Sequence, residues 1–209
     1  MIKAILFDFD GVIAESMDIK TDAFARLFGE FGPEIVKKVV AHHRAHGGVS
    51  RFEKILYYHR EYVGKPINEA ELAQWCGRFS DLVLEAVVSS PYVPGALELL
   101  ESCHKKYSCF IITGTPREEM EEILSRKGLK RFFVGIYGSP AAKPGIVKEI
   151  ISSHKFDPKE IIYIGDAMTD YEAAKGAGIA FIGRVPEGKP NFFPPDVVVV
   201  TDLRSISLQ

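Results

Sequence analysis

Residues 4–12, AILFDFDGV, join an apolar run to two aspartates and a glycine. The run from Ala4 to Phe9 has the length and composition of a strand buried on both faces of a parallel sheet, and an Asp-Gly pair ends it, as turn residues do. Side chains alternate along a strand, so the carboxylates of Asp8 and Asp10 should project from the same side. Two carboxylates this close need a cation or a proton between them.

Apolar runs of the same kind recur at residues 108–113, 161–165 and 179–183, with less distinct ones at 133–138 and 197–200. Stretches with helical periodicity separate them, at roughly 95–106, 116–127, 144–154 and 168–176. Strands that alternate with helices form right-handed βαβ units. The expected fold class is therefore α/β, with a doubly wound parallel sheet as a Rossmann-like core.

Residues 16–90 interrupt this alternation, because they contain no convincing strand. Their amphipathic stretches fall at about 17–31, 33–45, 50–62 and 69–88. We therefore expect an all-helical cap at 16–90, inserted into a core made of residues 1–15 and 91–209. Closure of the cap over the core would hinge near Glu15–Ser16 and Tyr92–Pro94.

The composition is that of a packed globular protein, with 46% hydrophobic residues and a net charge of −2 that gives no reason to expect nucleic acid as a partner. Three cysteines lack the spacing of a disulfide framework or a zinc site, so we expect them to be reduced. No apolar run reaches the roughly eighteen residues of a membrane span, and no signal peptide is recognisable. These patterns predict a cytoplasmic monomer that acts on a small molecule, away from membranes.

Polar residues follow the predicted strands at the edge where an open parallel sheet binds ligands. They are Asp8, Asp10, Thr113, Gly114, Thr115, Lys143, Asp166 and Asp170. Oxygen ligands without Cys or His favour Mg²⁺ over zinc. Lys143 precedes Pro144, which disfavours helical backbone and predicts an extended loop. Acidic groups with a metal on one side, and hydroxyl, amide and ammonium donors on the other, make a site for phosphoryl transfer.

In order and spacing, DFDGV at 8–12, the apolar run that ends at Thr113, Lys143-Pro144 and GDAMTD at 165–170 resemble the four motifs of the haloacid dehalogenase superfamily of phosphohydrolases. The helical insertion resembles the cap of its phosphoglycolate phosphatase and beta-phosphoglucomutase-like branch. This resemblance implies a Mg²⁺-dependent phosphatase that hydrolyses a small phosphorylated metabolite through an aspartyl-phosphate intermediate.

The resemblance also implies a role for each residue. Asp8 would attack phosphorus, while Asp10 would protonate the leaving alcohol and then take a proton from water. Lys143 would neutralise charge between nucleophile and phosphate. The phosphate oxygens would be bound by Thr113, Gly114 and Thr115. The implied Mg²⁺ ligands are Asp8, the backbone carbonyl of Asp10, Asp166 and Asp170.

The cap offers further candidates. GVSR at 48–51 resembles the segment with which beta-phosphoglucomutases reach a distal phosphate, so Arg51 is a candidate substrate ligand. Ser16 is another, although capping of a helix is the favoured interpretation. Residues 35–65 contain seven Lys and Arg against two Glu, which we expect on solvent-facing helix surfaces rather than on a positive lid. His42 and His46 lie one helical turn apart, without the third ligand that a zinc site needs.

Three other activities remain open. A haloacid dehalogenase would use the same nucleophile, but that branch typically lacks a second aspartate such as Asp10. A phosphomutase is closer, although the beta-phosphoglucomutase branch typically has an acidic residue where this chain has Gly165. A response-regulator receiver also gathers acidic residues with Thr and Lys, but it is shorter and has no cap. Phosphoglycolate, a sugar phosphate and a nucleoside monophosphate are all compatible substrates.

Overall fold

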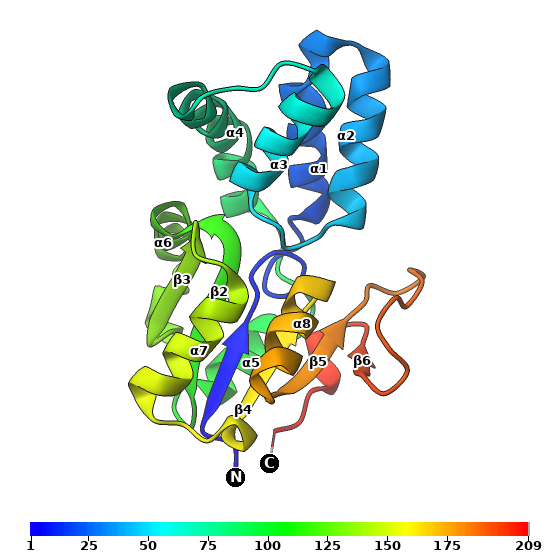
Figure 1. Cartoon of the computed structure of the whole chain (residues 1–209). Coiled ribbons are helices and arrows are strands. Elements are labelled where there is room, and N and C mark those ends of the chain that lie inside the picture. The colour runs from blue at the N-terminus through cyan, green and yellow to red at the C-terminus, as the bar shows by residue number, and fades with distance from the viewer. Residues whose placement is uncertain (209) are drawn as a thin grey trace.

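In the computed structural model, which describes residues 1–208, six parallel strands form one sheet in the lower half of Figure 1. They are β1 (Ala4–Phe7), β2 (Ser108–Pro116), β3 (Gly135–Ser139), β4 (Ile161–Gly165), β5 (Ala180–Arg184) and β6 (Val198–Val200). Their order is β3-β2-β1-β4-β5-β6, so the chain winds outward from β1 in both directions. The predicted doubly wound α/β fold is confirmed.

Helices cover both faces of the sheet. The helices α5 (Ala96–Cys103) and α6 (Arg117–Arg126) pack on one face, and α7 (Lys143–His154) and α8 (Met168–Ala177) pack on the other. Along β1, Ile5 and Phe7 join the first packing cluster, while Ala4 and Leu6 join the second. Because each face is covered, the strand is apolar at every position. Figure 1 shows α7 and α8 in front of the sheet.

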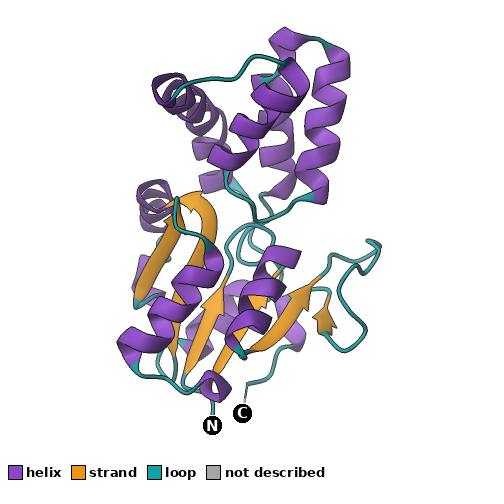
Figure 2. Cartoon of the chain, in the orientation of Figure 1, coloured by secondary structure: helices purple, strands orange, loops and turns teal. Residues whose placement is uncertain are grey.

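The segment between β1 and α5 is helical throughout its regular structure, as the purple upper half of Figure 2 shows. Its helices are α1 (Met17–Leu27), α2 (Pro33–Ala45), α3 (Arg51–Tyr58) and α4 (Glu69–Ser89). We call the part from the start of α1 to the end of α4, residues 17–89, the helical insertion. Its interior is aromatic, with the ring of Tyr58 in edge-to-face contact with those of Phe24 and Phe28. The expected boundaries of a separate cap domain stay a prediction.

Short helical turns complete the chain. They are the 3₁₀ turns Gly29–Phe31, Lys130–Phe132, Pro158–Glu160 and Leu203–Ser205, and the π turn His59–Val63. The turns Gly29–Phe31 and His59–Val63 take the place of the last residues of the helices predicted at 17–31 and 50–62. Among the described helices, none combines the length and apolar character that crossing a bilayer requires.

The chain enters and leaves the helical insertion through two paired segments. Ala14 forms an antiparallel bridge with Tyr92. The Glu15 amide donates to the Pro91 carbonyl at 3.0 Å, and the Val93 amide donates to Ile13 at the same distance. The hinge expected at these segments stays a prediction, but their pairing keeps the two crossings together beside the carboxyl edge of the sheet.

Candidate active site

The strand β1 delivers Asp8 and Asp10 to the carboxyl edge of the sheet, although it ends at Phe7 rather than at the predicted Phe9. The Asp8 amide still donates to the Ile164 carbonyl of β4 at 3.0 Å. The Phe9 amide donates instead to the Asp8 carboxylate Oδ1 at 2.7 Å, so the backbone leaves the ladder there. Both carboxylates are buried and line one cavity.

Three of the predicted metal ligands converge. Carboxylate oxygens of Asp8, Asp166 and Asp170 lie within 4.8 Å of one another. Gly11 makes room for them, because its φ is +72° and a Cβ there would collide with the Asp166 carboxylate. Burial, with the charge of Asp170, raises the pKa of Asp8 to about 7, and burial raises the pKa of Asp166 well above its ordinary value. A divalent cation would relieve this repulsion, and the all-oxygen donor set fits Mg²⁺.

The Asp10 carboxylate is not part of that group. It accepts hydrogen bonds from Ser16 Oγ at 2.5 Å, from Thr115 Oγ1 at 3.3 Å and from the Lys20 ammonium. Burial alone would raise the pKa of Asp10, but the charge and hydrogen bond of Lys20, with that of Ser16, lower it below its ordinary value. Asp10 therefore has the ionised form that a general base needs. The metal-binding role of its backbone carbonyl stays a prediction.

Ser16 occupies the N-cap position of α1, but its side chain makes no capping hydrogen bond, so the capping interpretation is wrong. Its backbone is already helical, with φ −111° and ψ −1°, whereas a capping side chain needs extended backbone to reach the free amides. Lys20 was not predicted as a site residue. It follows Ser16 by one helical turn and also donates to Thr115 Oγ1 at 2.7 Å. Residues four apart lie on the same face of a helix, so the spacing from Ser16 was the sequence signal that could have identified Lys20.

Lys143 connects two of the carboxylates. Its ammonium donates to Asp8 Oδ2 at 2.8 Å and to Asp170 Oδ1 at 2.6 Å. Burial alone would lower the pKa of Lys143, but the charges of Asp170 and Asp8 raise it above its ordinary value. The expectation of an extended loop is wrong, since Lys143 is the first residue of α7. Pro144 is tolerated there because amides of the first turn have no helical partner to lose.

The end of β2 supplies the predicted phosphate-binding residues. The strand runs to Pro116, beyond the predicted end at residue 113. Thr113 is buried, and its Oγ1 accepts a hydrogen bond from the Thr115 amide at 3.2 Å. Gly114 lies directly beneath the helical insertion, because a Cβ there would be 2.9 Å from the Gly48 carbonyl oxygen. The close approach of the two backbones requires glycine at this position.

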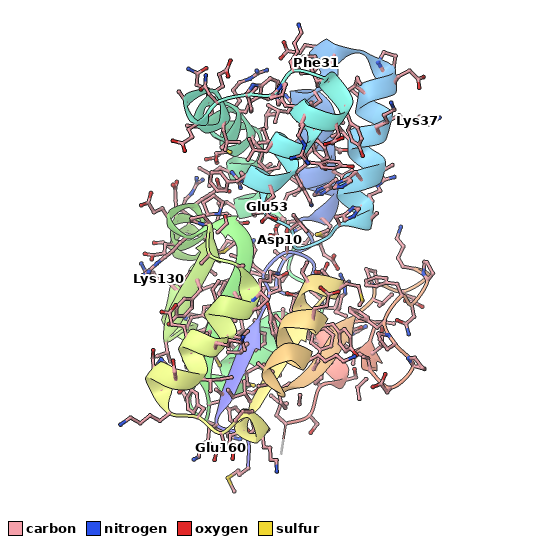
Figure 3. The ribbon with its side chains drawn as sticks, in the orientation of Figure 1. Asp10, Phe31, Lys37, Glu53, Lys130 and Glu160 are labelled. Carbon is pink, nitrogen blue, oxygen red and sulfur yellow. The ribbon has the colours of Figure 1, made fainter. Side chains whose placement is uncertain are left out.

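A cavity of about 40 Å³ lies between the sheet edge and the helical insertion. The sheet side is formed by Asp8, Asp10, Gly114, Thr115 and Asp166, and the other side by Met17, Lys20, Phe24, His43, Gly48, Val49, Arg51, Lys54 and Phe79. Figure 3 shows Asp10 at this junction, with Glu53 of α3 above it. The sheet side carries carboxylates, and the insertion brings four basic side chains, those of Lys20, His43, Arg51 and Lys54, to face them.

The basic residues expected on solvent-facing surfaces are not all there. Lys37 is exposed, but the exposed fractions of Arg51, Lys54 and His43 are only 4%, 2% and 4%. The expectation is wrong for Lys54 and for His43, because these two side chains line the cavity while Lys37 lies on the exposed side of α2. Arg51, expected as a candidate ligand instead, lines the same cavity. An amphipathic pattern identifies a polar face without saying what that face meets.

A family model confirms the resemblance that the motifs indicate. The model of haloacid dehalogenase-like hydrolases matches residues 5–184. The chain belongs to this family.

Curated relatives and solved structures agree with that assignment. A phosphoglycolate phosphatase of Haemophilus influenzae is 26% identical over 189 residues, which cover 87% of this chain and 84% of the relative. One from Pseudomonas putida is 23% identical over 214 residues, covering 98% and 78%. The structure of beta-phosphoglucomutase from Clostridium difficile has a TM-score of 0.80 at 20% identity, covering 99% and 94% of the two chains. A predicted phosphoglycolate phosphatase from Haemophilus somnus has a TM-score of 0.71 at 21% identity, covering 95% and 93%.

In this haloacid dehalogenase-like hydrolase, Arg51 links the helical insertion to the core. Its guanidinium donates to both carboxylate oxygens of Glu119 on α6, at 2.5 and 2.7 Å, and to Ser80 Oγ at 2.6 Å. Arg51 also lines the cavity, so its predicted role as a substrate ligand stays a prediction. Nothing in the sequence pattern identified Glu119, because the contact joins helices far apart in the chain.

The loop before α3 contacts the core of the hydrolase beside the site. The Thr169 hydroxyl donates to the Gly47 carbonyl at 3.3 Å. A Cβ at Gly48, where φ is +73°, would collide with Thr169 and lie 3.2 Å from the Lys143 ammonium. His42 and His46, which precede this loop, stack on each other with ring centroids 3.8 Å apart.

Proposed function

We propose that this hydrolase is a Mg²⁺-dependent phosphatase that cleaves a small phosphate monoester through an aspartyl-phosphate on Asp8. The observation that carries the proposal is that the Asp8 carboxylate meets those of Asp166 and Asp170 and the buried ammonium of Lys143. The names of the curated relatives, phosphoglycolate phosphatases matched over most of their length, support the same reaction class.

The first step transfers the phosphoryl group to the protein. An Asp8 carboxylate oxygen attacks phosphorus, the bond from phosphorus to the ester oxygen breaks, and the leaving alkoxide takes a proton from Asp10. The arriving phosphate is a like charge beside Asp10, which raises the pKa of that carboxyl and lets it hold the proton it donates. Lys143 and the Gly114 amide offset charge on the transferring oxygens.

The second step releases phosphate. Asp10, ionised again, takes a proton from a water molecule whose oxygen attacks phosphorus, and the bond to Asp8 breaks. Mg²⁺ held by Asp8, Asp166 and Asp170 would supply positive charge to the phosphate oxygens and keep the carboxylates ionised. The helical insertion covers this edge of the sheet and limits the access of bulk water.

A phosphomutase is an alternative that shares this fold, and two contacts weigh against it. A Cβ at Gly165 would lie 2.6 Å from Asp170 Cγ, so the acidic residue expected there in a beta-phosphoglucomutase has no room. Arg51, the expected ligand of a distal phosphate, is already neutralised by Glu119. Dehalogenation is disfavoured because it requires neither the acid Asp10 nor a cation held by the carboxylates of Asp8, Asp166 and Asp170.

The proposal is tested by measuring phosphate release from a panel of phosphorylated metabolites, with Mg²⁺ and with excess EDTA. Phosphoglycolate, sugar phosphates, nucleoside monophosphates and glucose 1-phosphate should be included, the last with a readout for glucose 6-phosphate. We expect release only with Mg²⁺. Undiminished release in EDTA would overturn the metal assignment, and conversion of glucose 1-phosphate without phosphate release would favour the mutase.

The role of Asp10 has its own test. Asp10→Asn should slow hydrolysis of alkyl phosphates more than hydrolysis of aryl phosphates, because a stable leaving group needs little help from an acid. Equal losses on the two kinds of ester would contradict the acid role.

A further inference from the structure

The helical insertion buries a lysine that has no acidic partner. Lys54 lies on α3, and its ammonium contacts His43 Nδ1 of α2 at 2.9 Å. Within residues 1–208, the structure places no carboxylate within ion-pairing distance of it. His43 Nε2 is also buried and has no hydrogen-bond partner. The ammonium is thus withdrawn from water with only a neutral hydrogen-bond partner, and His43 Nε2 with none.

This arrangement is costly for the fold. An ammonium without a counter-ion in contact loses its hydration and regains only part of that free energy from a neutral hydrogen-bond partner. Burial, with the nearby charges of Lys20 and Lys143, lowers the pKa of Lys54 to about 7. The neighbours Phe24 and Phe79 would accept an apolar side chain of the same length. Packing therefore does not account for a lysine here.

The pair lies where a substrate would extend. Lys54 and His43 line the same cavity as Asp8, from the opposite side. A phosphoryl group in line with Asp8 must direct the rest of its molecule toward the helical insertion, since the sheet closes the other side. The cavity between Asp8 and Lys54 is small, about 40 Å³, so only a short group can lie between phosphorus and Lys54. What meets Lys54 is therefore the far end of a short molecule.

The hydrogen bond between the two residues fixes what they offer. The Lys54 ammonium donates to His43 Nδ1, so the proton of the neutral imidazole must be on Nε2, which becomes a donor. Burial lowers the pKa of His43 to about 3, which keeps the ring neutral. The pair then presents one positive charge and two kinds of N–H donor, which suits a carboxylate.

We propose that Lys54 and His43 bind a carboxylate at the far end of the substrate, so that the hydrolase selects short phosphorylated carboxylic acids. This inference rests on the proposed phosphatase function and adds the substrate class to it. A second phosphate fits less well, since a dianion needs more than one cation and Arg51 is engaged with Glu119.

A matched substrate pair tests the proposal. 2-Phosphoglycolate and 2-hydroxyethyl phosphate have similar length and differ in the carboxylate. Lys54→Met should lower kcat/KM for phosphoglycolate by about 10- to 100-fold, as loss of a hydrogen bond to a charged group does, and change kcat/KM for the alcohol less than about threefold. The control is Lys37→Met, which alters an exposed lysine on the outer side of α2 (Figure 3) and should change neither value. Circular dichroism and melting curves establish that each variant is folded.

Binding provides a second readout that does not need turnover. Calorimetry on Asp8→Asn with Mg²⁺ should show tighter binding of phosphoglycolate than of 2-hydroxyethyl phosphate, and Asp8→Asn/Lys54→Met should lose the preference. Equal affinities for the two ligands in Asp8→Asn, or equal losses of kcat/KM on both substrates in Lys54→Met, would overturn the carboxylate site and leave the phosphatase proposal intact. If Asp8→Asn prefers phosphoglycolate but the wild type releases no phosphate from any ester, the carboxylate site is supported and the phosphatase proposal is overturned. Preference for ethylene glycol bisphosphate over phosphoglycolate would overturn the carboxylate assignment.

Discussion

Replacing Lys54 with methionine should stabilise the fold, by an amount that depends on pH. The side chain is 2% exposed, and methionine retains its length while removing the charge. Burial lowers the pKa of Lys54 from 10.5 to about 7 in the folded protein, whereas the unfolded chain keeps the ordinary value. The ionised lysine therefore opposes folding, and the variant is relieved of that cost.

The expected size follows from the two pKa values. A change from 10.5 to about 7 corresponds to a cost on the order of 5 kcal/mol when both states are protonated, below pH 7. Between pH 7 and 10.5 the folded state releases its proton while the unfolded state keeps it, so the cost falls by about 1.4 kcal/mol per pH unit. The stability gained in Lys54→Met should thus be largest below pH 7 and shrink by about 2 kcal/mol between pH 7 and 9.

Urea unfolding of the wild type and Lys54→Met at pH 6, 7, 8 and 9 measures this difference, with Lys37→Met as the exposed control. The groups whose charges act on Lys54 are Lys20, Lys143, Asp10 and Asp166, with His43 in hydrogen-bond contact. They are present in both proteins, so the difference between the two curves isolates Lys54. A gain that is the same at every pH, or a loss of stability at pH 7, would refute the reasoning.

Three further changes test the site and its connection to the helical insertion. Asp8→Asn should abolish Mg²⁺-dependent phosphate release and leave the circular dichroism spectrum unchanged; appreciable turnover would exclude Asp8 as the nucleophile. Glu119→Gln should destabilise the protein by about 3–5 kcal/mol in urea, since it leaves the buried Arg51 without its partner, and a loss below about 1 kcal/mol would mean that the pair is well hydrated. Gly165→Ala should cost about 1–3 kcal/mol by crowding Asp170 and raise the Mg²⁺ concentration needed for half-maximal activity; an unchanged requirement would contradict that contact.

The sheet and its polar edge could be predicted because each depends on local sequence and simple geometry. The run from Ala4 is apolar at every position because helices cover both faces of β1. Parallel strands end at a common edge, so residues that follow different strands must meet there. The common edge thus predicts that Asp8, Asp166 and Asp170 meet, and their carboxylate oxygens lie within 4.8 Å of one another.

Backbone details at single residues were less predictable. Lys143 lies in a helix despite the proline after it, because Pro144 falls in the first turn, where no helical hydrogen bond is lost, and Lys143 pairs there with Asp8 and Asp170. Ser16 stands at a helix start without capping it, since its hydroxyl contacts a buried carboxylate instead. In both cases a tertiary contact decides what a local preference leaves open.

The sequence by itself determined the doubly wound α/β sheet and the aspartates at its edge, because these follow from periodicity and chain connection. Only the tertiary structure decided that Lys20, Lys54 and His43 face those aspartates and that Arg51 is paired with Glu119. A lysine on the polar face of a helix has the same sequence pattern whether water or a cavity lies opposite. The packing of the helical insertion against the sheet makes that choice, and it sets the charge that a substrate meets.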